Sequence, residues 1–499
     1  MSLVPYKFPP GVQRNGTTFQ SYGRWVDASL MRFLGGTIQP VGGWRKASPT
    51  QVSGLARALH AWRDNTGGRW CAIGTNSKLY AYQGGTIADI TPTGLNVGRV
   101  DGIAGIGYSF STYGSSTYGT ARPVPSAPSP PILAADSWSL DSWGQYLVGC
   151  SSGDGRAFQW LLDTGVLPTP ITNAPVGNRG LVVTPERFLV LFGAGGDPRA
   201  IQWCTQEDYT VWTPSATNTA GSLRVQTDGY LKAARRVRGG TLLWTDVDVH
   251  LMSYLGSPLV YGLDRVGTAC GIISAGAVSV VNQGAVWMGQ SGFFMYNGAL
   301  QPLPCEVQDY VFSDLNRDQS SKIVSGSNSA FNEVWWFYPS STSNENDRYV
   351  VWNYVENTWT IGLLARTAWL DLGVYDSPFA ATSAGYVYEQ ELGWTNDGVA
   401  IGAGRYLTGG PLDLSPGDKV LTVTQVIPDE ANQGQVCVRF TTRFTPNGTQ
   451  YSFGPYTIGS GYVDARLTGR QVSMQIEGVS DADFRIGNFR LDVTGGGRR

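Results

Sequence analysis

Short segments in which apolar and polar residues alternate recur along most of the chain, separated by turns rich in glycine, asparagine or aspartate. Seven copies share one plan: a short apolar strand with an aromatic residue, a turn, and an alternating strand that ends in an aromatic residue. The copies begin at Gly68, Gly144, Glu186, Gly239, Gln283, Asn332 and Ser377. Because period-two alternation between turn residues indicates β-strands, each copy predicts a hairpin.

The spacing of these hairpins predicts a β-propeller. Their starts lie 76, 42, 53, 44, 49 and 45 residues apart, and all but the first interval match a blade of roughly 40–50 residues. Strand signals flank the hairpins, such as "TIADITP" after the first and "TWTIG" after the sixth, so each blade has about four strands. We expect six or seven blades, since the hairpin "LMRFLGGTIQPVGGW", turned at Gly35 and Gly36, could close the ring. Unrelated hairpins in a sandwich or barrel are the alternative.

The first interval is too long by about 30 residues, and the excess is "GYSFSTYGSSTYGTARPVPSAPSPP" from Gly107 to Pro131. We interpret it as part of a loop inserted between blades one and two, at about 104–133. The candidate partner-binding residues in this loop are Tyr108, Phe110, Tyr113, Tyr118 and Arg122. Aromatic side chains favour interfaces, and the proline run favours an extended spacer. A solvated surface loop is the other interpretation.

One helix is expected, in "LPCEVQDYVFSDLNRDQ". Pro304 stands at a plausible N-terminus, and Val307, Val311 and Leu315 fall on one face with Tyr310 beside them. We expect this helix to cap a groove between blades.

The pattern of apolar and polar residues changes after about residue 400. Segments such as "KVLTVTQVIPD" and "QVCVRFTTRFTP" alternate strictly, which predicts a small antiparallel β-sandwich. The expected fold class is therefore all-β, with a propeller of six or seven blades followed by this sandwich. The expected divisions are an N-terminal arm and hairpin over 1–50, the propeller over 51–400, and the sandwich over 401–499.

Composition narrows the function classes. The chain has 499 residues, of which only 15% are charged, a net charge of -2, and far more arginine than lysine. This balance argues against a nucleic-acid grip built on bulk positive charge. Arginine pairs bidentately and stacks on aromatic rings, which suits protein interfaces.

Candidate chemistry is sparse, and we expect neither an enzyme nor a metal or cofactor site. The six cysteines are far apart, there are two histidines, and no apolar run is long enough for a membrane helix or a signal peptide. Asp246, Asp248 and His250 would share one face of a strand, but a structural role for His250 is favoured over catalysis. Asp154 and Gly155 suggest a hairpin turn more than a sialidase-type Asp box.

Several stretches together resemble a known family. They include "RALHAWRDNTGGRWCAIGTNSKLYAYQGGTIADITP", "DPRAIQWCTQEDYTVWTPSATNTAGSLRVQTDG", "LVYGLDRVGTACGIISAGAVSVVNQGAVWMGQSGFFMYNG" and "GRQVSMQIEG" with "FRIGNFRLDV". The chain is similar here to the tail nozzle proteins of short-tailed bacteriophages, also called tail tubular or head-completion (packaged-DNA stabilisation) proteins. The resemblance runs from about residue 20 to 495, and its motifs are structural rather than catalytic.

The resemblance implies a virion protein, assembled in the host cytoplasm, that forms a ring of usually six copies below a portal–adaptor assembly. It also implies contacts with tail fibres or spikes and a needle or plug, and passage of double-stranded DNA through the ring without sequence-specific contacts. We expect a neutral or acidic lumen, because each contact between arginine and phosphate would slow the DNA, and we expect most arginines in subunit contacts. The alternative function is a β-propeller that binds or degrades glycans.

Overall fold

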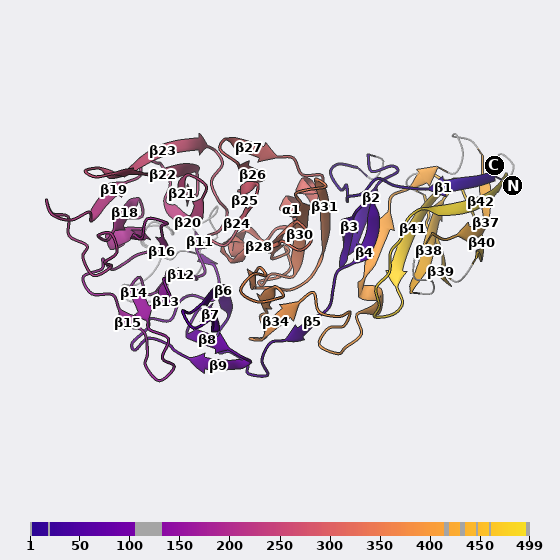
Figure 1. Cartoon of the computed structure of the whole chain (residues 1–499). Helices are drawn as coiled ribbons and strands as arrows, with labels where there is room; N and C mark the ends of the chain where they lie inside the picture. The colour runs from indigo at the N-terminus through magenta and orange to yellow at the C-terminus, as the bar shows by residue number, and fades with distance from the viewer. Residues whose placement is uncertain are drawn as a thin grey trace, which may run out of the picture.

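The structure is a computed structural model that describes residues 2–17, 20–104, 132–413, 419–429, 435–445, 448–458 and 461–495. It is almost entirely antiparallel β-structure, in two parts that lie side by side (Figure 1). The larger part, on the left of that view, is built from residues between Trp44 and Gln390. The expected all-β class is confirmed.

The larger part contains seven four-stranded antiparallel sheets within the described ranges. The first three are β6 (Ala56–Arg63), β7 (Arg69–Thr75), β8 (Leu79–Gln83) and β9 (Thr86–Asp89); β12 (Trp138–Trp143), β13 (Tyr146–Ser151), β14 (Ala157–Trp160) and β15 (Thr169–Pro170); and β16 (Gly180–Val183), β17 (Leu189–Phe192), β18 (Ala200–Trp203) and β19 (Gly221–Arg224). Each of the seven predicted hairpins supplies the second and third strands of one sheet. The alternation in the sequence therefore located the middle of every blade.

The next three sheets follow the same plan. They are β20 (Leu231–Val237), β21 (Gly240–Thr245), β22 (Asp248–Gly256) and β23 (Val260–Thr268); β24 (Val278–Val281), β25 (Gly284–Met288), β26 (Phe293–Tyr296) and β27 (Leu300–Leu303); and β28 (Val324–Asn328), β29 (Glu333–Tyr338), β30 (Arg348–Asn353) and β31 (Thr358–Leu363). Their second strands β21, β25 and β29 are nearly all buried, as in "EVWWFY" of β29. Sheets packed on both faces need such continuous apolar runs.

The seventh sheet closes the ring. It joins β32 (Ala368–Leu370), β33 (Phe379–Ala381) and β34 (Val387–Gln390) to β5 (Trp44–Lys46), a strand that precedes the first blade. The first strands of successive blades contact one another in the order β6, β12, β16, β20, β24, β28 and β32, and β32 contacts β6 again. The structure is thus a propeller with seven blades in the part that it describes.

The strand that closes the ring is not the predicted hairpin itself. That hairpin, β3 (Met31–Leu34) and β4 (Thr37–Pro40), forms a two-stranded sheet of its own. It turns at Gly35 and Gly36, whose φ angles of 60° and 73° favour glycine. The suggestion that this hairpin completes the ring is wrong: the next strand, β5, completes it by pairing with β34.

The smaller part is a sandwich of two sheets. One sheet has the order β1 (Ser2–Tyr6), β42 (Phe489–Gly495), β37 (Leu421–Ile427) and β40 (Val463–Gly469). The other has the order β2 (Trp25–Ser29), β35 (Tyr406–Gly409), β41 (Gln471–Gly478), β38 (Val436–Arg443) and β39 (Tyr451–Thr457), with β36 (Leu412–Asp413) also on β41. The N-terminal arm therefore supplies strands to both sheets of the sandwich, and both chain ends lie at its far end in Figure 1.

A shared core joins the two parts. One hydrophobic cluster includes Trp25 of β2 and Phe440 of β38 together with Trp287, Trp336 and Trp359 of blades five and six. This continuous buried contact holds the propeller and the sandwich together.

The expected helix is α1 (Gln308–Asp314), which lies between blades five and six and is followed by the 3-10 helix η3 (Arg317–Lys322). Val307, Val311 and Leu315 are buried in the shared core, and Phe312 packs its edge on Phe293 of β26. Two short 3-10 turns, η2 (Ala194–Gly196) and η4 (Gly402–Gly404), complete the helical content of the described residues.

Candidate functional site at the propeller axis

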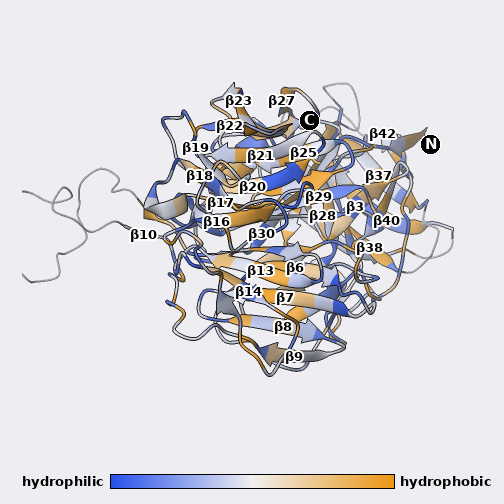
Figure 2. Ribbon diagram, turned by 60° about the vertical axis from the view of Figure 1, so that its left-hand side comes forward, coloured by the Kyte–Doolittle hydropathy of each residue, from blue (hydrophilic) through white to orange (hydrophobic). Residues whose placement is uncertain are grey.

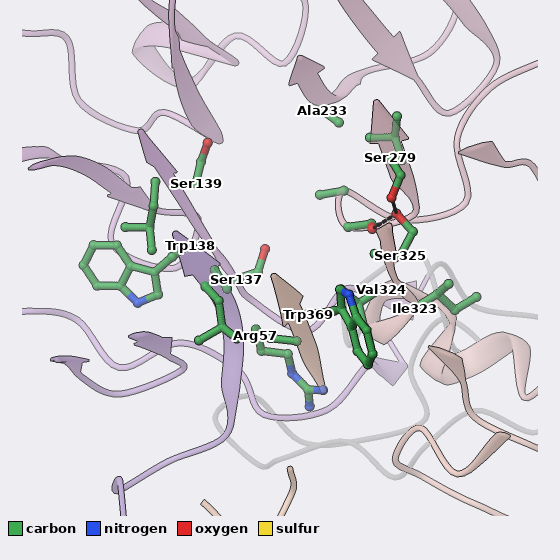
Figure 3. A pocket seen from close by; sticks show the side chains of 18 of the residues that line it. Arg57, Ser137, Trp138, Ser139, Ala233, Ser279, Ile323, Val324, Ser325 and Trp369 are labelled. Carbon is green, nitrogen blue, oxygen red and sulfur yellow. Dashed lines mark hydrogen bonds between the residues drawn. The ribbon is translucent and has the colours of Figure 1, made fainter. Parts of the chain in front are cut away.

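A cavity of about 260 Å³ lies where the first strands of the blades surround the axis. Residues in or next to each of these seven strands line it. One from each blade is Leu59, Leu140, Arg179, Ala233, Val278, Val324 and Trp369. Figure 3 shows the cavity, with Trp138 of β12 and Trp369 of β32 on the two strands that flank β6, and with the hydroxyl of Ser279 donating a hydrogen bond to Ser325 at 3.0 Å. Such a concave site at the centre of a ring is the default place for a ligand.

A short hairpin at one end of this cavity holds the base of the insertion. β10 (Ile103–Ala104) pairs with β11 (Ile132–Leu133). Gly102 exchanges two hydrogen bonds of 2.9 Å with the side chain of Gln319, and the Ala135 amide donates to Ser321 at 3.0 Å. The base of the insertion thus reaches from blades one and two to the residues before blade six. In Figure 2, β10 lies on the side of the propeller away from the chain ends.

A buried ion-pair network anchors the same base. The Lys322 side chain is fully buried and contacts both Asp101 and Glu345. Arg57 donates two hydrogen bonds to Glu345, at 2.8 and 3.0 Å, and one to the Val100 carbonyl at 3.1 Å. The charges of Arg57 and Lys322 are therefore matched by carboxylates, and both side chains are structural anchors.

Two other arginines line the cavity without such partners. In the described part of the chain, neither Arg179 nor Arg235 makes an ion pair; Arg235 donates one hydrogen bond, from Nη1 to the Ala234 carbonyl at 2.9 Å. Arg179 lies over the Tyr230 ring, 5.4 Å from its centroid. The acidic residue of the lining is Asp371, which accepts hydrogen bonds from Ser329 and the Leu372 amide. The lining is therefore net positive.

A polar cluster lies beyond Arg235. Arg236 pairs with Asp141 at 3.0 Å, and the Val183 amide donates to the same carboxylate at 2.8 Å. His60 Nε2 lies 2.7 Å from the Ser142 hydroxyl oxygen. Burial lowers the pKa of His60, and Asp141 opposes that effect only in part. A neutral imidazole beside a hydroxyl is able to accept its proton, which is the first requirement for an activated serine.

The residues chosen from the sequence as a partner-binding loop lie outside the described residues. Tyr108, Phe110, Tyr113, Tyr118 and Arg122 belong to 105–131, so their docking role stays a prediction.

The histidine considered from the sequence is buried. His250 Nε2 lies 3.2 Å from Asp248, and both side chains are only 4% exposed. The Asp248 carboxylate also accepts hydrogen bonds from Thr227 at 2.8 Å and from Thr245. Asp246 sits in the turn before β22, where it accepts from the Tyr230 amide at 2.8 Å. The expectation that all three residues share one face of a strand is therefore wrong for Asp246, and their contacts hold the turn before β22 together.

The Asp154–Gly155 pair forms the turn between β13 and β14, as the sequence suggested. Asp154 accepts hydrogen bonds from the Asn96 amide and the Arg156 guanidinium, at 2.8 and 2.7 Å. These contacts tie the turn to the segment that follows β9.

Sequence reasoning missed the arginines of the cavity. Arg57, Arg179 and Arg235 stand in or just before the first strand of a blade. The repeats were read from the second and third strands, so these positions were not compared with one another. They stand 11, 7 and 4 residues before the hairpins that begin at Gly68, Glu186 and Gly239, so no common spacing marks them in the sequence.

The described residues hold neither a cluster of metal ligands nor a helix that could span a membrane. Within the described residues, no group of three or more His, Cys, Asp or Glu side chains is placed to hold a metal ion. No described helix has the length and apolarity needed to span a membrane.

Comparisons with known proteins found distant similarities to solved structures. No family model matches the chain, and no curated protein matches it. A streptogramin B lyase structure is similar at 11% identity over 68% of this chain and 95% of that one, with a TM-score of 0.39. An inactive variant of virginiamycin B lyase from Staphylococcus aureus with Quinupristin covers 69% of this chain and 98% of its own, at 7% identity and a TM-score of 0.42.

A structure titled glycoside hydrolase covers 90% of this chain and 99% of its own, at 7% identity and a TM-score of 0.26. None of these three titles names a phage tail protein. At this level of similarity the neighbours carry no argument about activity.

Proposed function

We propose that this chain is a structural subunit of a ring in the tail of a short-tailed phage, which conducts and retains the packaged genome. The observation that carries the proposal is the sequence resemblance to tail nozzle proteins, which extends over both the propeller and the sandwich. The fused core of the two parts supports it, because a load-carrying ring needs subunits that do not bend between their parts.

The rigid junction has a specific basis at Arg32. Its guanidinium contacts Glu333 of blade six at 3.0 Å and also Glu391, which follows blade seven. The backbone adds a hydrogen bond from the Val12 amide to the Trp359 carbonyl at 2.7 Å. The N-terminal segments are thus tied to two blades as well as to the sandwich.

The genome would pass between copies of the chain and not through a propeller. The axial cavity has a volume of only about 260 Å³. Duplex DNA is far larger, since its major groove alone is about 12 Å wide. A duplex therefore does not fit the axis of one subunit. A ring of several copies, six by the resemblance, supplies the wider channel.

Arginines that are already paired within the chain add no free positive charge to that channel. Arg32, Arg57 and Arg348 form ion pairs within the chain, so their charges are already matched. We therefore propose subunit contacts only for those arginines that have no ion-pair partner within the chain. We retain the proposal of a neutral or acidic lumen, which follows from the net charge of -2.

The proposed partners are further copies of the chain, the portal–adaptor ring, tail fibre or spike proteins, and a needle or plug. Electron microscopy of the purified full-length chain tests the proposal. Rings or short tubes with rotational symmetry are the expected result. A monomer that also fails to assemble when mixed with a portal–adaptor complex would refute it.

The second candidate is a propeller that binds or degrades glycans. The observations that favour it are the axial cavity and the pair of His60 and Ser142, 2.7 Å apart. The titles of the neighbouring structures, two lyases and a glycoside hydrolase, lie closer to this candidate, although their similarity is too low to transfer an activity. A monomer that shortens a bacterial polysaccharide, and loses this activity on His60→Gln substitution, would establish it.

A further inference from the structure

The charges around the axial cavity are unbalanced. Four basic residues line it, Arg57, Arg179, Arg235 and Lys322, against one acidic residue, Asp371. Glu345 and Asp101 neutralise Arg57 and Lys322. Within the described residues, no carboxylate forms an ion pair with Arg179 or Arg235.

Arg235 faces this cavity from the first strand of blade four. It lies on β20, opposite Leu242 of β21, and Ala233, two positions earlier on the same strand, also lines the cavity. Successive side chains of a strand point to opposite faces, so Ala233 and Arg235 share the face toward the axis.

Most hydrogen-bonding capacity of Arg235 is left over. A guanidinium has five N–H donors, and one bond, to Ala234, is made within the described residues. Burial lowers the pKa of Arg235, and Asp141 offsets this only in part because its carboxylate is engaged by Arg236 and the Val183 amide. A buried charge without its own partner costs free energy that a bound anion would return.

The size and polarity of the cavity limit the ligand. Its volume of about 260 Å³ corresponds to roughly nine water molecules at about 30 Å³ each. Serine hydroxyls on several blades, including Ser139, Ser279 and Ser325, make the wall polar. A small hydrated anion fits this space.

We propose that the axial cavity binds a small oxyanion, a phosphate or a carboxylate, with Arg235 as its main contact and Arg179 as a second positive group. The guanidinium fork matches the oxygens of either group bidentately. Every residue of the site belongs to one chain, so the site is independent of the proposed ring.

Calorimetric titration and thermal unfolding of the purified full-length chain test this site. Sodium phosphate and sodium acetate are compared with sodium chloride at equal ionic strength, so that general screening is subtracted. The wild-type chain should bind one of the two oxyanions saturably and melt at a higher temperature in its presence. If phosphate binds and acetate does not, the ligand is phosphate-like; the reverse identifies a carboxylate.

Arg235→Gln should weaken that binding about tenfold or more, because a charge-assisted bond is lost. Arg238→Gln is the matched control, since Arg238 is exposed just beyond β20 and does not line the cavity. Circular dichroism in chloride buffer checks that both variants are folded, and Arg179→Gln, with a smaller loss expected, provides a second test. Equal binding by wild type and Arg235→Gln, or no saturable binding of either oxyanion by wild type, would overturn the proposal.

Discussion

Replacing Glu333 with glutamine is expected to change how the stability of the chain depends on pH. Glu333 accepts two hydrogen bonds from Arg32, at 3.0 and 3.1 Å, and a third from the Trp335 indole at 3.0 Å. The same guanidinium also donates a hydrogen bond to Glu391, whose carboxylate accepts another from the Gly42 amide at 2.9 Å. One buried cation thus faces two carboxylates.

This surplus of negative charge makes the ionised form of Glu333 costly. Burial raises the pKa of Glu333 to about 7 from its ordinary 4.5; Arg32 acts against the rise and Glu391 adds to it. Because the folded state holds the proton more tightly than the unfolded state, the contribution to stability is complete below about pH 4.5. It is lost as the pH rises toward 7 and is constant above that.

The size of the effect follows from the two pKa values. The rise of the pKa from 4.5 to about 7 corresponds to about 3 kcal/mol in total, most of which is lost between pH 5 and pH 8. Glu333→Gln cannot ionise and escapes this loss. The stability of the variant relative to wild type should therefore improve by about 2–3 kcal/mol from pH 5 to pH 8.

Urea unfolding followed by tryptophan fluorescence, at pH 5 and pH 8, measures this change. Glu389→Gln is the control, because Glu389 pairs at 3.1 Å with Arg45, whose side chain is 68% exposed. That variant should follow the wild-type pH dependence. If Glu333→Gln also keeps the wild-type dependence, the reasoning about the buried pair is wrong.

Three further predictions concern the ring, the shared core and the insertion. Ala47→Pro removes the hydrogen bond from the Ala47 amide to Val387 at 2.9 Å beside the closing strand β5, so it should cost at least about 1 kcal/mol and speed proteolysis near Trp44; unchanged resistance would argue against closure by β5. Trp359→Ala removes a ring that packs 4.9 Å from Phe293 and should cost about 3–5 kcal/mol in urea unfolding, with Trp359→Phe costing less; equal losses would contradict the packing account. Deleting 109–127, in the segment outside the described residues, should leave the melting temperature unchanged and impair tail assembly; normal assembly of infectious particles would remove the docking role of Phe110, Tyr113, Tyr118 and Arg122.

The parts of the fold that could be predicted from the sequence are those set by neighbouring residues. Each hairpin, such as the one that begins at Gly68, depends on a local turn and on alternation over a few residues, and all seven were located. The helix near Val311 was found for the same reason, since its apolar face repeats at helical spacing.

The pairings that could not be predicted join distant residues. Trp44 of β5 pairs with Gln390 of β34, and β1 pairs with β42 at the other end of the chain. A short strand such as "WRK" has no local signal that names its partner, so the ring closure and the arm's place in the sandwich depend on tertiary packing. For the same reason the sequence predicts a separate arm over 1–50, whereas β1 and β2 of this range pair with strands of the sandwich.

The axial site escaped prediction because its residues are scattered. Arg57, Arg179 and Arg235 meet only when the ring closes, and each is an ordinary strand residue in the sequence. The His60–Ser142 contact likewise joins two blades. Function built at a symmetry axis is therefore harder to predict from one sequence than the blades that surround it.

A cryo-electron microscopy map of the tail of an infectious particle that carries this chain tests the central claim most directly. We predict several copies, six by the resemblance, around a channel that runs between the propellers, with each copy a seven-bladed wheel continuous with its sandwich. A particle in which the chain is absent from the tail, or present as a single copy away from the DNA path, would contradict the account.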